Sequence, residues 1–344
     1  MLGNFHDLLY TQQKDANFCS EINLLQAVKD LCRKAFLERQ ESSLLEAHRI
    51  LYRINLAHLA VPWDASPTNL LHPLIANVRY TINEYWEQSE RKKYAHLLAD
   101  LPSTTGFADW VQKFVDDHPK NCVHPIFPFL RDQATYQQMR EFFFQETPLE
   151  MLFGDIVAML LPGVYCDIKA EIATNFWDEV GHADMNDVHR ELRARLMDHL
   201  SIPRDCYLKQ IDLFVREELE LINTYLSVVL DRTKMTQAIG AMLATELMIS
   251  NRFVYQIEGW KRNGVGVEHL KYLTEHVTVD AEHAEHWMER VVLPLVRRYP
   301  AVIPDLALGA ARRLDVAGGV CDRLYRHLQN GHFATTLPGE AAFA

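Results

Sequence analysis

Three metal-ligand-type residues recur at helical spacing in the segment His276-Val-Thr-Val-Asp280-Ala-Glu-His283. At about 100° per residue, these three positions fall within roughly 60° of one another on a helix. Leu273 and Trp287 continue the same stripe, so two imidazoles and a carboxylate stand where a core-facing helix would carry Leu or Ile. Burying them without partners is strongly unfavourable. A metal ion would pair with all three; the alternative is a solvated polar face.

The composition is that of an ordinary soluble globular protein. The chain has 344 residues, of which 48% are hydrophobic and 24% charged, and its net charge of −11 argues against nucleic acid or an anionic membrane as the main partner. No apolar run approaches the roughly 18 residues of a membrane span, and the first residues lack a secretory signal. The six cysteines form no CxxC pair. We therefore expect a cytoplasmic protein with free thiols.

The chain predicts an all-α fold, because Gly and Pro number only 14 each and period-2 alternation is scarce. Pro119, Pro125 and Pro128 interrupt the helical pattern and mark a domain boundary. We expect an auxiliary or dimerisation module over 1–125, a catalytic bundle over 126–334 and a tail over 335–344. A homodimer is the expected assembly. The bundle is predicted to consist of long helices at about 131–162, 167–200, 204–228, 232–261, 266–298 and 304–330.

Other predicted helices also carry a carboxylate on an apolar stripe. Glu246 lies between Met242 and Ile249, a turn away on either side. Glu146 has Phe142 before it and Leu149 after it, with Glu150 as the competing acid on that segment. A lone carboxylate with apolar neighbours a turn away is buried if the helix packs, and it then needs a partner.

The third such acid is Glu179, and it is followed by two imidazoles. His182 lies three residues later, on the same face of an unbroken helix. His189 lies ten residues later, about 15 Å along a regular helix, so it reaches the same site only if the helix is broken. The intervening Gly181 and polar residues are weak enough helix formers to permit a break.

Four predicted helices thus direct acids or imidazoles inward. Several carboxylates with imidazoles and no thiolate fit one or two divalent ions of the iron or manganese type better than zinc. Two metals that share a bridging carboxylate best explain so many anionic ligands in an apolar bundle.

At these residues the sequence resembles the haem-oxygenase-like diiron oxidases and oxygenases. The resemblance rests on Gln145-Glu146, on the segment from Glu171 to Gly181 that contains Asn-Phe-Trp-Asp-Glu, on His189, on Glu246 and on the 276–283 triplet. It covers about 131–330 and implies a haem-oxygenase-like helical bundle. The layout, with a helical module ahead of the metal domain, is similar to that of an N-oxygenase of this family.

The resemblance implies a set of ligands for two ferrous ions. One iron would take Glu146, Glu179 and His189, and the other mainly Glu246, His276 and Asp280, with Glu179 as candidate bridge and His283 completing the set. A rival assignment replaces His189 by His182 and resembles ferritin-like diiron N-oxygenases.

The implied activity is that of a non-haem diiron enzyme with O₂ as cosubstrate. We expect a small amino-acid-derived substrate, an external electron donor and a role in natural-product biosynthesis. N-oxygenation is the leading reaction, by similarity of the N-terminal module. Oxidative C–C cleavage or decarboxylation, and desaturation, are the alternatives at the same site. A non-catalytic helical interaction protein is the alternative of a different class, and it predicts no iron binding.

Overall fold

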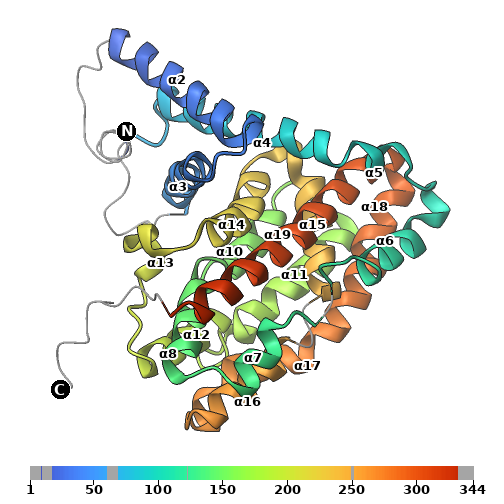
Figure 1. The fold of residues 1–344 in the computed structure, drawn as a ribbon. Helices are drawn as coiled ribbons and strands as arrows, with labels where there is room; N and C mark the ends of the chain where they lie inside the picture. Colours follow the sequence, from blue (N-terminus) through green and yellow to red (C-terminus); the bar gives the residue numbers. More distant parts are fainter. Residues whose placement is uncertain (1–8, 10–17, 60–68, 122, 249–251, 332–344) are drawn as a thin grey trace.

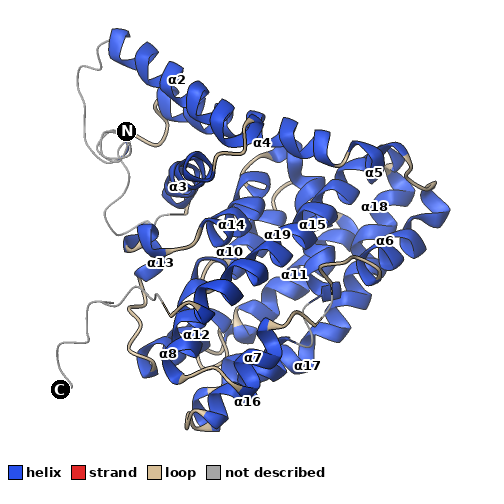
Figure 2. Ribbon diagram, viewed as in Figure 1, coloured by secondary structure: helices blue, strands red, loops and turns tan. Residues whose placement is uncertain are grey.

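Every regular element in the computed structural model is a helix, which confirms the all-α prediction (Figure 1). The structure describes residues 9, 18–59, 69–121, 123–248 and 252–331, and at 18–21 and 278–282 only the backbone. Within these ranges helices are joined by short loops and turns, and no strand occurs (Figure 2). No helix in these ranges is long and apolar enough to cross a membrane.

The first three described helices pack around a core of their own at one end of the molecule (Figure 1). They are α2 (Phe18–Cys32), α3 (Glu41–His58) and α4 (Pro73–Lys93). Val28, Ile50 and Trp86 are buried in this core. The core is joined to the main bundle by a buried polar contact, in which Asn55 Nδ2 donates to Asn223 Oδ1 over 3.0 Å.

The remaining helices form the main bundle. Their bounds are α5 (Ala95–Ala99), α6 (Phe107–Asp116), α7 (Ile126–Asp132), α8 (Tyr136–Gln145), α9 (Thr147–Glu150), α10 (Phe153–Leu160), α11 (Cys166–Glu179), α12 (His189–His199), α13 (Cys206–Lys209), α14 (Arg216–Val229), α15 (Met235–Met248), α16 (Arg252–Arg262), α17 (Lys271–His286), α18 (Leu293–Arg298) and α19 (Ile303–Gln329). The helices α5 and α6 precede the predicted boundary at 125, yet they pack against α19 of this bundle.

The helices α15 and α19 pack closely against each other in the interior (Figure 1). Gly240 and Gly309 make this possible. A Cβ atom at Gly240 would lie 2.1 Å from the carbonyl oxygen of Leu306, and one at Gly309 would lie 2.0 Å from that of Gln237. Only glycine lets the two backbones approach this closely.

Four of the six long helices predicted for the bundle are interrupted. The predicted helix 131–162 is divided into α7 to α10, with Pro148 at the start of α9. The predicted helix 167–200 is divided into α11 and α12 by a 3₁₀ turn at Gly181–Ala183. The predicted helix 204–228 is divided into α13, a 3₁₀ turn at Ile211–Leu213 and α14. The predicted helix 266–298 contains a π-helical turn at Trp287–Val292, directly after α17.

Candidate metal centre

A small cavity of about 40 Å³ lies where several helices of the bundle meet. Its acid and imidazole lining comes from α9, α11, α12, α15 and α17 and consists of Glu150, Glu179, His189, Glu246, His276 and His283. The structure therefore brings five of the seven predicted ligands together. Glu146 is not among them, and the side chain of Asp280 lies outside the described residues.

The break after α11 places His189 at this cavity. Gly181 has a φ of +61°, and a Cβ atom there would lie 2.3 Å from the carbonyl carbon of Asp187. The chain can therefore fold back only with glycine at this position. As a result His189 Nδ1 lies 3.3 Å from Glu179 Oε1, with both side chains 13% exposed. An unbroken helix would have separated them by about 15 Å.

His182, the alternative to His189, points away from the cavity. Its side chain is 66% exposed, and its Nε2 lies 2.7 Å from Asp178 Oδ1. The other oxygen of Asp178 lies 2.9 Å from His283 Nε2, and His283 Nδ1 is 3.8 Å from Glu246 Oε2. Asp178 thus orients a side chain of the cavity. The sequence did not indicate a role for Asp178, because this residue is not on the apolar helical stripe that contains Glu179.

The environment of His276 keeps its imidazole neutral and fixes its tautomer. Burial lowers the pKa of His276 to about 4, so the ring carries one proton at neutral pH. Its Nδ1 lies 2.8 Å from the backbone carbonyl oxygen of Tyr272. A carbonyl can only accept, so the proton is on Nδ1 and the lone pair of Nε2 is available to a metal. The rings of Phe253 and Tyr272 each lie 4.7 Å from the imidazole and hold it in place.

Glu146 and Glu150 lie on either side of Pro148 and line different cavities. Glu150 lines the 40 Å³ cavity, whereas Glu146 lines a larger one. Arg252 joins the two acids: its Nη2 lies 2.6 Å from Glu150 Oε1, and its Nη1 lies 3.3 Å from Glu146 Oε1. The Tyr272 hydroxyl also donates to Glu150.

These contacts have opposite effects on the two carboxyl groups. Burial raises the pKa of Glu146, and the charge of Arg252 only partly offsets that effect. Burial acts on Glu150 as well, but the charges of Arg252 and Arg193 outweigh it and lower the pKa of Glu150. Glu150 is therefore the acid held as a carboxylate, the form that binds cations. Neither arginine was predicted, because their positions follow from packing between segments distant in the sequence.

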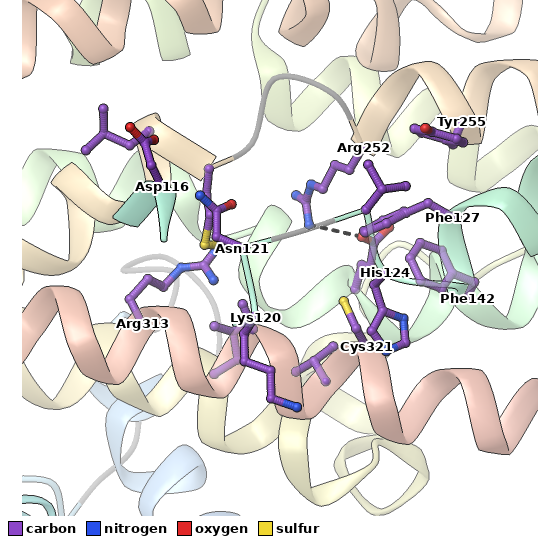
Figure 3. A pocket seen from close by; sticks show the side chains of 17 residues that line it. Asp116, Lys120, Asn121, His124, Phe127, Phe142, Arg252, Tyr255, Arg313 and Cys321 are labelled. Atoms are coloured by element: carbon purple, nitrogen blue, oxygen red, sulfur yellow. Dashed lines mark hydrogen bonds and ion pairs between the residues drawn. The ribbon is translucent and has the colours of Figure 1, made fainter. Parts of the chain in front are cut away.

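A second, larger cavity has a volume of about 380 Å³ (Figure 3). Arg252 lines both cavities. Polar and charged side chains on its wall include Lys120, His124, Glu146 and Arg313. Phe127, Phe142 and other apolar side chains cover the rest. A cavity of this size can hold a small organic molecule.

The donor set of the smaller cavity fits a divalent metal of the iron type. Three carboxylates and three imidazoles line it without any thiolate, which favours iron or manganese over zinc. As the described side chains stand, no three of them are close enough to hold one ion. A bound metal would draw them together, and Asp280 lies on the same helix as His276 and His283.

Comparisons with known proteins agree with this chemistry. Residues 140–318, just over half of the chain, match a haem-oxygenase-related family described as iron-containing redox enzymes. Among solved structures, the chain is similar to a CADD-like protein of unknown function from Nostoc punctiforme PCC 73102, with a TM-score of 0.47 and 14% identity over 68% of this chain and 99% of that chain. No curated protein matches the sequence. The family match confirms the resemblance on which the haem-oxygenase-like prediction rests.

Proposed function

The chain belongs to the haem-oxygenase-like family of iron-containing redox enzymes, and we propose that it is a non-haem diiron enzyme that activates O₂ on a small amino-acid-derived substrate. The observation that carries the proposal is the cavity in which carboxylates and imidazoles from separate helices meet. N-oxygenation is the proposed reaction, in which an amine, O₂, two electrons and two protons give a hydroxylamine and water. An external donor would supply the electrons.

We propose that Glu150 takes the place predicted for Glu146. The proposed ligands are then Glu150, Glu179 and His189 for one iron, and Glu246, His276, Asp280 and His283 for the other. The support for Glu150 is its position on the wall of the smaller cavity and its ionised state beside Arg252.

The other residues of the site would orient the ligands and exclude water. Two bound ferrous ions would supply the reducing power that O₂ activation needs. The Tyr272 carbonyl holds His276 in the tautomer that exposes Nε2, and Arg252 holds Glu150 in place. Leu149, Phe153 and Phe253 line the cavity and keep bulk water from it.

Iron binding by matched variants tests the ligand set. The full chain is loaded anaerobically with Fe(II), and bound iron is measured after removal of excess metal. We expect two irons per chain in the native protein, a clear loss in Glu150→Gln and little change in Glu146→Gln. Both variants replace an acid that contacts Arg252 by its amide, and the two acids line different cavities. A chain that binds no iron would reject the proposal, and loss of iron in Glu146→Gln alone would restore the original assignment.

Product analysis tests the reaction. Iron-loaded protein is supplied with O₂, a reductant and candidate amino acids, and the products are identified by mass spectrometry. Oxygen gained on nitrogen supports N-oxygenation. Loss of a carbon fragment would instead establish the cleavage reaction, and loss of two hydrogens would establish desaturation.

A further inference from the structure

A buried cation without an acidic partner lines the larger cavity. The side chain of Arg313 comes from α19, and the residue is only 1% exposed. Its Nε donates to Thr245 Oγ1 over 3.1 Å and also to the Tyr225 hydroxyl. Its Nη1 is buried and donates to no atom of the described chain. Hydroxyl acceptors do not neutralise a guanidinium, and buried charges in proteins are normally paired.

The other basic side chains of this cavity are neutralised within the protein. Lys120 Nζ lies 2.6 Å from Asp322 Oδ2. Arg252 is paired with Glu146 and Glu150. For Arg313, by contrast, no carboxylate lies within ion-pair distance in the described ranges. The undescribed residues that adjoin lining residues in the sequence, 122 and 249–251, include no Asp or Glu.

The position of Arg313 connects the larger cavity with the candidate metal centre. Thr245, which accepts a hydrogen bond from Arg313, lines the smaller cavity, and Leu247 and Met248 of the same helix line the larger one. Figure 3 shows the guanidinium of Arg313 directed toward Asn121 and the interior of the cavity, with Arg252 on another side. An acid bound at Arg313 would therefore have the rest of its structure in a 380 Å³ space next to the metal centre.

We propose that the larger cavity binds the substrate and that Arg313 pairs with a free carboxylate of that substrate. This inference rests on the proposed function and specifies its substrate class: a free amino acid or a related small carboxylic acid. A substrate attached to a carrier protein through a thioester would lack this charge. Arginine is suited to the role, because its planar guanidinium matches the geometry of a carboxylate.

Pairs of amino acids and their amides test the inference directly, because the amide keeps the shape of the acid but removes its charge. The probes are the L-isomers of leucine, lysine, arginine and phenylalanine, each with its carboxamide. Binding to the full chain is measured by calorimetry, with and without Fe(II). We expect at least one acid to bind about 10- to 100-fold more tightly than its amide, as a hydrogen-bonded charge pair would produce. Failure of every acid to exceed its amide in the native protein would reject the inference, whatever the variants do.

Variants then assign the preference to Arg313. In Arg313→Gln the ratio between acid and amide should fall to within about threefold. Arg313→Lys should retain part of it. Arg298→Gln removes a cation that pairs with Asp167 and lines neither cavity, so it should leave the preference unchanged. Circular dichroism and the unfolding temperature establish that each variant is folded. Persistence of the full preference in folded Arg313→Gln would overturn the assignment.

Iron content, measured in the same samples, keeps this inference separate from the proposed function. A chain that prefers acids over amides but binds no iron would leave the carboxylate site standing and reject the diiron proposal. A chain that binds two irons but does not prefer acids over amides would support the diiron proposal and reject the carboxylate site.

Discussion

Two histidines of one short segment occupy opposite environments. His189 lies at the small cavity, with its ring centroid 4.9 Å from that of His276, whereas His182 is exposed and contacts Asp178. The sequence indicated that one of the pair belonged to the site. It could not show which histidine, because the choice depends on how the chain folds back between α11 and α12, and spacing in the sequence does not fix that path.

We therefore predict different effects of their substitution on iron binding. His189→Ala should lose a proposed ligand and bind markedly less iron, since removal of a group that holds the metal typically lowers affinity by about tenfold or more. His182→Ala should bind nearly as much iron as the native chain. Iron per chain after anaerobic loading measures both. The reverse pattern would favour the assignment of His182 as ligand.

For the two acids of the 131–162 segment, too, sequence spacing could not identify which side chain belongs to the site. Helical spacing places Glu146 on an apolar stripe, and Glu146 is indeed buried. Spacing alone left Glu150 as the competing acid and could not show that Glu150, and not Glu146, lines the smaller cavity.

At the scale of elements, the turn between α11 and α12 depends on one glycine. Gly181→Ala places a methyl group against the backbone at Asp187 and forces an alanine into a left-handed conformation. We expect a loss of about 1–3 kcal/mol in the free energy of unfolding. Iron binding should also fall, because the turn positions His189.

Gly264→Ala is the matched control for this turn. Gly264 also has a positive φ, of +83°, but no atom lies within 4 Å of the added methyl group. Its variant should lose about 1–2 kcal/mol from backbone conformation alone and bind iron normally. Urea unfolding and iron content measure the two effects. Normal iron binding in Gly181→Ala would show that the turn does not control the site.

The contact between α15 and α19 gives a second prediction about elements. Gly240→Ala and Gly309→Ala should each lower the free energy of unfolding by about 1–3 kcal/mol or more, because the methyl group meets the backbone of the facing helix. Gly319→Ala, on α19 but with nothing within 4 Å, should raise it by up to about 1 kcal/mol through helix propensity. Urea midpoints distinguish these signs. Equal effects at all three positions would contradict the close approach.

Helix content was predictable from periodicity, and so was the interruption between 160 and 166. The weak helix formers around Gly181 permitted the break after α11, but the break within 266–298 was not predictable. A π-helical turn such as Trp287–Val292 has no signature in composition, since every residue in it also forms ordinary helix. The association of α5 and α6 with α19 was equally hidden, because it depends on contacts between segments about 200 residues apart.

At the scale of the whole molecule, a buried histidine makes stability depend on pH. His48 is completely buried beside Phe36 and Trp86, and neither ring nitrogen has a hydrogen-bond partner among the residues that the structure describes. Burial, followed by the charges of Arg216 and Arg312, lowers the pKa of His48 to about 3. In the unfolded chain the pKa is about 6.5.

The unfolded state therefore binds a proton between about pH 6.5 and pH 3 that the folded state does not bind. The contribution of His48 to stability is complete above pH 6.5 and falls by about 1.4 kcal/mol for each pH unit below it. In His48→Leu, the decrease in the free energy of unfolding below pH 6.5 should be smaller by about 1.4 kcal/mol for each pH unit. Urea unfolding at pH 7, 6, 5 and 4.5 measures the slope.

His96→Gln is the control for this measurement, because His96 is exposed on α5. It should leave the slope unchanged. An unaltered slope in His48→Leu would show that His48 is protonated in the folded protein, contrary to its surroundings.

Arg252 connects the two cavities electrostatically, because its one guanidinium contacts an acidic side chain in each. Any molecule that changes its contact with Glu146 also changes its hold on Glu150. By thermodynamic linkage, any effect of filling one cavity on affinity in the other equals the reverse effect. A substrate could in this way prepare the metal centre before oxygen arrives, and the metal centre could in turn retain the substrate.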